Sequence, residues 1–133
     1  MRYLLDTHVL LWSLLDIGKL SKKARDILES KKNEILVSSL SLWEISLKVS
    51  LGKMDFENLE VEDLPDSMGK MGFGIITLEP GEAANYKYLP SRTDHKDPFD
   101  RMLIWQAITR NLILISKDKK VREYKEYGLK ALW

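Results

Sequence analysis

The stretch around which the fold is organised reads His95-Lys96-Asp97-Pro98-Phe99-Asp100-Arg101-Met102. Asp97 followed by Pro98 is typical of a helix start, because Asp is a good N-cap and Pro suits the first helical position. Asp100 then falls in the first turn, where its negative charge meets the positive end of the helix dipole. Residues 102–108 are apolar on nearly every side, which indicates a helix buried on more than one face. The stretch therefore predicts a rigidly held carboxylate at the entry to a buried helix.

Short apolar runs alternate with helical patterns along the rest of the chain. The expected strands are residues 2–5, 34–38, 74–78 and 111–115, with an edge strand at 129–133. The expected helices are residues 9–15, 20–28, 41–51, 62–71, 80–89, the central helix from 98, and 121–127. We therefore expect a single α/β domain over residues 1–133, with a central, mostly parallel sheet flanked by helices on both faces. Right-handed crossovers would place the carboxyl end of every strand at one edge of this sheet.

Composition and charge limit the class of protein. A chain of 133 residues fits one domain, and 44% hydrophobic with 31% charged residues is an ordinary soluble globular composition. The net charge of +1 gives no support to a strongly basic nucleic-acid-binding surface, although it does not exclude a local one. The absence of Cys excludes disulfides and thiolate zinc sites and is compatible with a reducing compartment.

The apolar N-terminus is not expected to be a signal peptide or a membrane anchor. Asp6 and His8 interrupt its apolar run, and no small-residue cleavage site follows. No stretch reaches the roughly 18 uninterrupted apolar residues of a membrane span. We expect a cytoplasmic protein.

Four acids occupy similar places relative to the expected elements. Asp6 ends the first strand, Glu44 lies early in the helix after the second strand, Asp100 opens the central helix, and Asp118 follows the strand at 111–115. Each also has a simpler explanation: Asp6 would cap the following helix, and Ser41-x-x-Glu44 has the spacing of a capping box. The sheet topology nevertheless predicts that all four acids meet at one edge.

A cluster of this kind favours a hard divalent cation. Two carboxylates about 4 Å apart repel by about 4 kcal/mol at an effective dielectric of about 20, so a cluster without a cation would be costly or partly protonated. Oxygen ligands suit Mg²⁺ or Mn²⁺, which can activate a water for attack on a phosphate. The sequence contains no Gly-x-Ser-x-Gly elbow, no cysteine nucleophile and no P-loop. Phosphodiester hydrolysis is therefore the chemistry that fits these residues.

As an ordered set, these motifs resemble the PIN-domain nucleases, and specifically the VapC-type toxins of prokaryotic toxin–antitoxin pairs. The resemblance spans essentially the whole chain, although each motif alone would be weak. It is carried by Tyr3-Leu4-Leu5-Asp6-Thr7-His8, Ser41-Leu42-Trp43-Glu44, the stretch from His95 to Leu103, Ile115-Ser116-Lys117-Asp118 and Ala131-Leu132-Trp133.

The resemblance implies a Mg²⁺- or Mn²⁺-dependent endoribonuclease. Its metal would be held by Asp6, Asp100 and Asp118, with Glu44 as the remaining acid, which would place a water or act as the base. The small hydroxyl residues Thr7 and Ser116 would line the site.

The central stretch and the basic residues have further expected roles. We expect Asp97 to act as an N-cap rather than a metal ligand, and His95 to be a loop histidine that is hydrogen-bonded nearby rather than a residue that approaches a phosphate. The basic residues expected near the RNA backbone are Arg101, Lys117, Lys119 and Lys120, the last two being more simply explained as solvated charges. Phosphate contacts would position RNA without specifying its sequence.

The resemblance also implies a homodimer and a cognate VapB-type antitoxin, a segment of which would fill a groove near the acids. Trp12, Trp43 and Trp105 lie on apolar helices, where core packing explains them at least as well as an interface. The alternatives are a PIN-type RNA-processing nuclease that is not a toxin, a catalytically inactive binding module, and a receiver-like Mg²⁺ phosphoacceptor domain. Receivers usually carry adjacent acids early in the chain, whereas Asp6 has no acidic neighbour.

Overall fold

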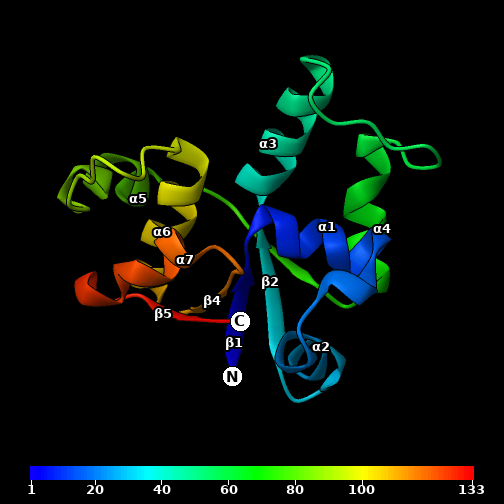
Figure 1. Cartoon of the computed structure of the whole chain (residues 1–133), viewed down its shortest axis with the longest axis horizontal. Coiled ribbons are helices and arrows are strands. Elements are labelled where there is room, and N and C mark those ends of the chain that lie inside the picture. The colour runs from blue at the N-terminus through cyan, green and yellow to red at the C-terminus, as the bar shows by residue number, and fades with distance from the viewer.

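A five-stranded sheet forms the centre of the structure, a computed structural model that describes every residue from Met1 to Trp133 (Figure 1). Its strands are β1 (Arg2–Leu5), β2 (Glu34–Ser38), β3 (Gly74–Ile76), β4 (Ile113–Ile115) and β5 (Lys130–Leu132). The strand order is β3-β2-β1-β4-β5, and every neighbouring pair is parallel. The prediction of a single α/β domain with a mostly parallel sheet is confirmed, and the sheet is in fact entirely parallel.

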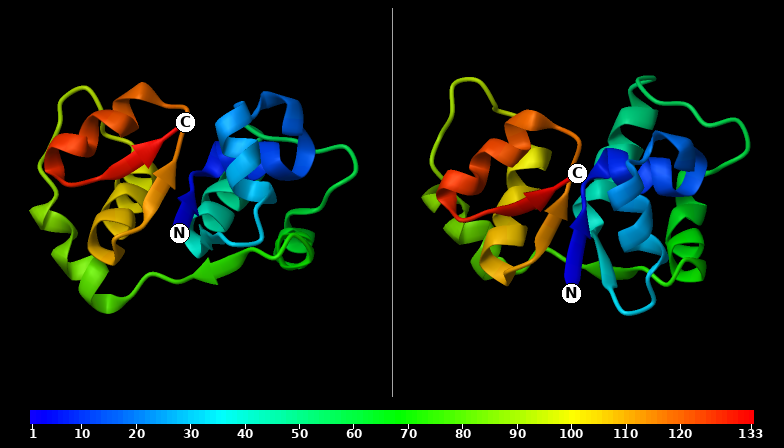
Figure 2. Two further views of the ribbon diagram at one scale, coloured as in Figure 1. Left: turned by 90° about the horizontal axis from the view of Figure 1, so that it is seen from below. Right: turned by 60° about the horizontal axis from the view of Figure 1, so that its bottom comes forward.

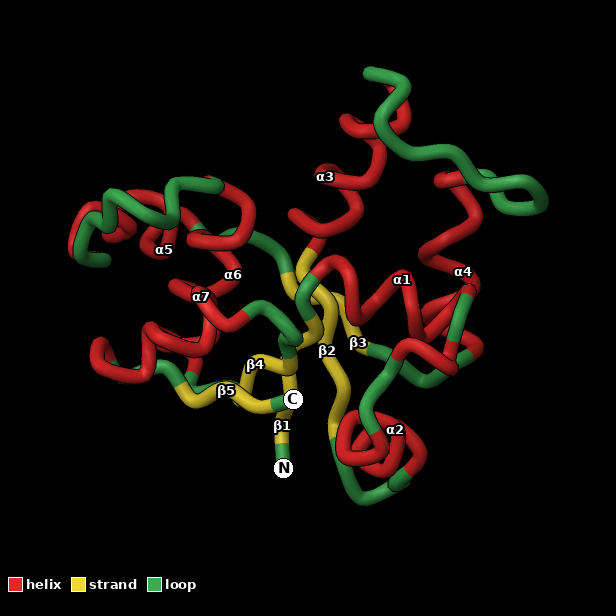
Figure 3. The backbone as a smooth tube through the Cα atoms, in the orientation of Figure 1, coloured by secondary structure: helices red, strands yellow, loops and turns green.

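The helices form two groups on either side of the sheet (Figure 2). One group contains α1 (Thr7–Leu15), α2 (Lys22–Glu29), α3 (Ser39–Ser50) and α4 (Leu64–Lys70), and the other contains α5 (Pro80–Asn85), α6 (Pro98–Arg110) and α7 (Lys119–Arg122). Irregular connections join them, including the long segment between α3 and α4 (Figure 3). None of these helices has the length and hydropathy that crossing a membrane would require.

The central strands are buried on both faces and divide the core in two. Because successive side chains of a strand point to opposite faces, Tyr3 and Leu5 of β1 pack against the first helical group, whereas Leu4 packs against the second. Leu4 and Leu5 are both fully buried, and such burial stabilises the fold by about 1.5–3 kcal/mol for each side chain. The short apolar runs of the sequence are thus the layer between two cores.

Several elements are shorter than expected. The expected helices at 80–89 and 121–127 are each a short α-helix followed by a 3₁₀ helix, η3 (Tyr86–Tyr88) and η4 (Glu123–Tyr127). The strand expected from 111 begins at Ile113, because Asn111 adopts a left-handed conformation with φ 55° and ends α6. Asn tolerates this conformation better than most residues, so it serves here as a helix terminator.

The start of α3 corrects one interpretation. This helix begins at Ser39, and its N-cap is Ser38, whose hydroxyl accepts a hydrogen bond from the Leu40 amide. Ser41 therefore lies inside the helix, so the capping-box interpretation of Ser41 and Glu44 is wrong. The Glu44 side chain is free to make contacts outside its own helix end.

Candidate functional site

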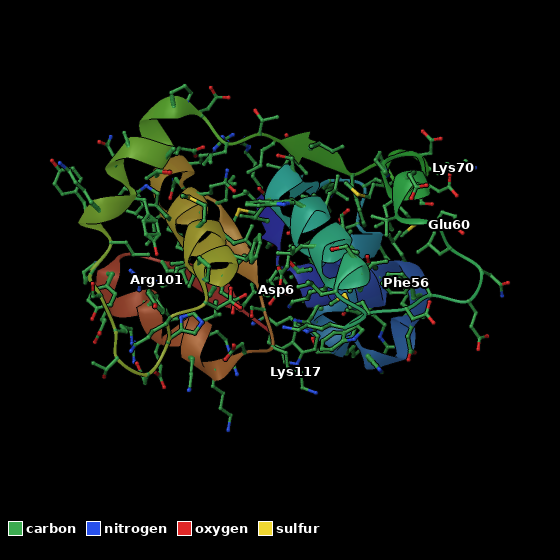
Figure 4. All side chains as sticks on the ribbon, turned by 90° about the horizontal axis from the view of Figure 1, so that it is seen from above. Asp6, Phe56, Glu60, Lys70, Arg101 and Lys117 are labelled. Atoms are coloured by element: carbon green, nitrogen blue, oxygen red, sulfur yellow. The ribbon has the colours of Figure 1, made fainter.

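Asp6 lies at the carboxyl end of β1, the central strand, between the two helical groups (Figure 4). One of its oxygens accepts a hydrogen bond of 2.8 Å from the Val9 amide, so it caps α1. Burial raises the pKa of the Asp6 carboxyl to about 6, although hydrogen bonds from Ser116 and Val9 lower it. The negative charge of Asp100 raises this pKa further, which places the two acids within electrostatic reach of each other.

The central stretch forms the entry to α6, as predicted. Asp97 is its N-cap, and one carboxylate oxygen accepts hydrogen bonds from the amides of Phe99 (2.9 Å) and Asp100 (3.2 Å). Asp100 in the first turn lies 3.3 Å from Nε2 of His95. Burial and the charge of Asp97 raise the pKa of the Asp100 carboxyl, the His95 hydrogen bond lowers it, and Glu44 raises it.

Glu44 is held from two sides. The Thr7 hydroxyl donates a hydrogen bond of 2.7 Å to one of its oxygens, and the Lys48 ammonium donates one of 2.7 Å to the other. This contact with Glu44 raises the pKa of Lys48, and the charges of Asp97 and Asp100 act in the same direction. Lys48 therefore places a positive charge beside Glu44 and within electrostatic range of Asp97 and Asp100.

Asp118 follows β4 and caps α7, with its carboxylate accepting a hydrogen bond of 2.8 Å from the Lys120 amide. The buried Ser116 accepts a hydrogen bond from the Asp118 amide. His95, Asp100 and Asp118 each offer a ligand atom, and these atoms all lie within 4.8 Å of one another.

The carboxyl edge of the sheet thus brings together all four acids predicted from the sequence. Asp100 and Asp118 belong to the compact group with His95. The charge of Asp100 raises the pKa of Asp6, and the charge of Glu44 raises the pKa of Asp100. The donor set is dominated by carboxylate oxygens, which suits Mg²⁺ or Mn²⁺. The raised pKa values of Asp6 and Asp100 show that ionisation is costly here, a cost that a bound cation would remove.

The predicted basic residues are not all at this edge. Arg101 is only 6% exposed and lies apart from Asp6 (Figure 4), which corrects the expectation that it contacts an RNA backbone. Lys117 is exposed, with its ammonium 5.8 Å from the ring centroid of Trp12. Lys119 and Lys120 are also exposed, and Lys120 donates to the Asp94 carbonyl.

Two residues of this site were missed by sequence reasoning. Lys48 carries a usable signal, because it lies four residues after Glu44, and residues at this spacing are neighbours on a helix. Tyr124 carries none: it is a fully buried aromatic residue near the C-terminus whose hydroxyl lies 2.9 Å from Nδ1 of His95. Its contact depends on a separation of 29 residues that no local pattern reveals.

Comparison with known families matches residues 3–127 to the PIN domain, so the chain belongs to the PIN-domain family. PIN domains are typically metal-dependent nucleases. Comparison with curated proteins gives no match.

Solved structures with a similar fold include chains of VapBC and FitAB complexes. A chain of VapBC2 from Rickettsia felis, bound to a DNA fragment from its promoter, has a TM-score of 0.69 and 21% identity, with 100% of this chain and 99% of that chain covered. FitAcB from Neisseria gonorrhoeae gives 0.65 and 18%, covering 100% and 97%. DNA-bound VapBC from Salmonella typhimurium gives 0.65 and 16%, covering 99% and 97%. At these identities the likeness establishes the fold.

Proposed function

We propose that this protein is a Mg²⁺- or Mn²⁺-dependent endoribonuclease, and that it is the VapC-type toxin of a toxin–antitoxin pair. The observation that carries the proposal is the gathering of Asp6, Glu44, Asp100 and Asp118 at the carboxyl edge of a PIN-family sheet. Ligands of open parallel sheets bind at this edge.

The acids divide into two roles in this proposal. Asp6, Asp100 and Asp118 hold the cation. Backbone amides keep the Asp6 and Asp118 carboxylates in place, and His95 contacts the Asp100 carboxylate. A cation bound there would lower the pKa of a water and stabilise negative charge on a phosphodiester. Glu44 orients the attacking water or accepts its proton, and Thr7 and Lys48 fix the direction of the Glu44 carboxylate.

The exposed side chain of Lys117, at the same edge of the sheet, suits binding to an RNA backbone. Lys117 lies in the connection between β4 and Asp118, so its ammonium is available for phosphate beside the acids. Such contacts position the strand and leave its sequence unspecified.

Partners form the second part of the proposal. We assign a second copy of the chain to the exposed face of α3 and its C-cap. Trp43 (60% exposed) and Leu47 (36%) lie on the helix and Leu51 (59%) at its C-cap, at intervals of four residues. Trp43 thus does not pack in the core. Two copies related by a twofold axis would cover this apolar stripe on each other.

The VapBC and FitAB complexes among the similar structures support a VapB-type antitoxin, whose basic residue would complement the acids. Copurification and solution mass test both partners.

RNA cleavage by the purified chain tests the enzymatic proposal. We expect cleavage with Mg²⁺ or Mn²⁺, loss of cleavage in chelator, and recovery when the metal is restored. Asp6→Asn should reduce the rate by more than about 100-fold, because even residues behind metal ligands contribute about 10–100-fold. Asp16→Asn is the matched control, since Asp16 lies at the other end of α1 in an exposed pair with Lys19.

Cleavage that persists in chelator or in Asp6→Asn would contradict the metal mechanism. The toxin role has its own readout: growth arrest on expression, relieved by co-expression of the small protein encoded beside it. Cleavage without growth arrest would indicate an RNA-processing nuclease instead.

A further inference from the structure

We propose that Arg101, Tyr124 and His95 form a hydrogen-bonded network that fixes the Asp100 carboxylate, in which the Nε2–H of His95 donates a hydrogen bond to Asp100 instead of Nε2 binding the metal. All three are positioning residues. The part of this inference that concerns metal affinity rests on the proposed function, whereas the part that concerns the position of the His95 proton does not.

The network runs from the interior to the acid cluster in three contacts. Nη1 of Arg101 donates to the Tyr124 hydroxyl at 2.8 Å, that hydroxyl lies 2.9 Å from Nδ1 of His95, and Nε2 of His95 lies 3.3 Å from Oδ2 of Asp100. The three residues behind Asp100 are 6%, 0% and 7% exposed, in the order Arg101, Tyr124 and His95. The rings of His95 and Tyr124 also pack edge to face, with centroids 5.4 Å apart.

The Tyr124 end of the network determines which His95 nitrogen carries the proton. A guanidinium can only donate, so the Tyr124 oxygen must accept from Arg101. Its own hydrogen then has one remaining partner, the Nδ1 atom of His95. If Nδ1 carried the proton, the Tyr124 hydrogen would be left without an acceptor at a fully buried position, which is costly.

The Asp100 end gives the same answer independently. A carboxylate only accepts hydrogen bonds, so Nε2 facing Asp100 is favourable when it carries a hydrogen and repulsive when it presents a lone pair. Both ends therefore select the tautomer with the proton on Nε2. A nitrogen that carries this hydrogen and donates a hydrogen bond to Asp100 has no lone pair for a metal, although Nε2 lies within the group of three potential ligands.

Arg101 forms the buried inner end of this hydrogen-bonded network. Its guanidinium donates to the Tyr86 hydroxyl, the carbonyls of Leu89 and Pro90, and Tyr124, and it forms no ion pair. Buried charges are usually paired, and Arg cannot lose its proton to avoid the cost. The negative charge nearest along the hydrogen-bonded network is Asp100. Arg101 thus polarises Tyr124 and His95 toward the acid cluster from behind.

Nitrogen NMR of the metal-free protein tests the tautomer directly. The protein has two histidines, His8 and His95, so the imidazole signals that remain in the His8→Gln variant belong to His95. We expect a protonated Nε2 and an unprotonated Nδ1 on His95. The opposite tautomer would overturn the inference, whether or not the protein binds metal or cleaves RNA.

Variants test whether the hydrogen-bonded network strengthens metal binding. The Kd for Mn²⁺ is measured by calorimetry, and only on variants whose circular dichroism matches that of the parent. Tyr124→Phe keeps the ring and removes the hydroxyl, so Asp100 alone would select the His95 tautomer. We expect a smaller excess of the Nε2-protonated form and a Kd raised about 10-fold. Tyr127→Phe, the same change in the ring that packs against Tyr124, should leave both unchanged.

Substitution of His95 separates orientation from ligation. His95→Gln retains an N–H donor near the position of Nε2, whereas His95→Leu does not, so Gln should keep a Kd within a few-fold of the parent and Leu should raise it about 10-fold. Equal losses in Gln and Leu, or a parent-like Kd in Tyr124→Phe, would overturn the inference. A parent chain that binds no Mn²⁺ would instead overturn the proposed function, and the tautomer would still decide the inference.

Discussion

Asp6 illustrates how one side chain serves both the fold and the site. It caps α1, and it is buried with its pKa raised to about 6. An Asp in an unfolded chain has a pKa of about 3.9, so between about pH 4 and 6 the folded metal-free protein holds a proton that the unfolded chain has lost. The stability that protonated Asp6 contributes is therefore present below about pH 4 and is lost as pH rises toward 6.

Asp6→Asn should remove the loss of stability that accompanies ionisation of Asp6, because Asn does not ionise. It should keep the cap of α1, because Asn is also a good N-cap. At pH 7.5 and without metal, we expect the variant to be more stable than the parent by about 2 kcal/mol, with little difference near pH 4. Urea denaturation at the two pH values measures both. A variant less stable than the parent at pH 7.5 would show that the carboxylate is not strained by burial.

At the scale of elements, the Glu82–Arg110 pair joins α5 to the end of α6. The two oxygens of Glu82 accept from Nε and Nη2 of Arg110 at 2.6 and 2.7 Å, and the same carboxylate accepts from the Glu79 amide. Arg110 holds the pKa of the Glu82 carboxyl at about 2. This acid therefore contributes stability above its unfolded pKa of about 4.3, and the contribution is lost as pH falls toward 2.

Glu82→Gln should lower the free energy of unfolding by about 2 kcal/mol at pH 7, with the difference from the parent shrinking as pH approaches 2. Asp26→Asn is the matched control: its pair with Lys22 is also short, at 2.8 Å, but both side chains are exposed, so a change below about 0.5 kcal/mol is expected. Equal losses for the two variants would contradict the role assigned to the partly buried Glu82–Arg110 pair.

Across the whole molecule, the sequence predicts best where one local signal dominates. The apolar runs of β1 and β2 match the observed strands, and Asp97-Pro98 marks the start of α6. The gathering of the acids follows from the parallel topology alone. What escaped prediction depends on tertiary contacts: the burial of Arg101, the contact of Tyr124 with His95, and the exposure of Trp43. The contacts and burial of these side chains are determined by neighbours distant in sequence, so local sequence patterns do not predict them.

The same topology predicts how a cation should affect global stability. Asp6 and Glu44 belong to elements of the first helical group, whereas Asp100 and Asp118 belong to elements of the second. A cation held by acids from both groups binds only the folded chain, because the unfolded chain scatters its ligands. Mn²⁺ at about 100 times its Kd should then add about 2.7 kcal/mol and raise the Tm by about 10 °C. Thermal unfolding followed by circular dichroism measures this shift, which Asp118→Asn should largely abolish and Asp16→Asn should retain. A Tm that does not respond to millimolar Mn²⁺, or that rises equally in Asp118→Asn, would mean that the acids do not act as one site.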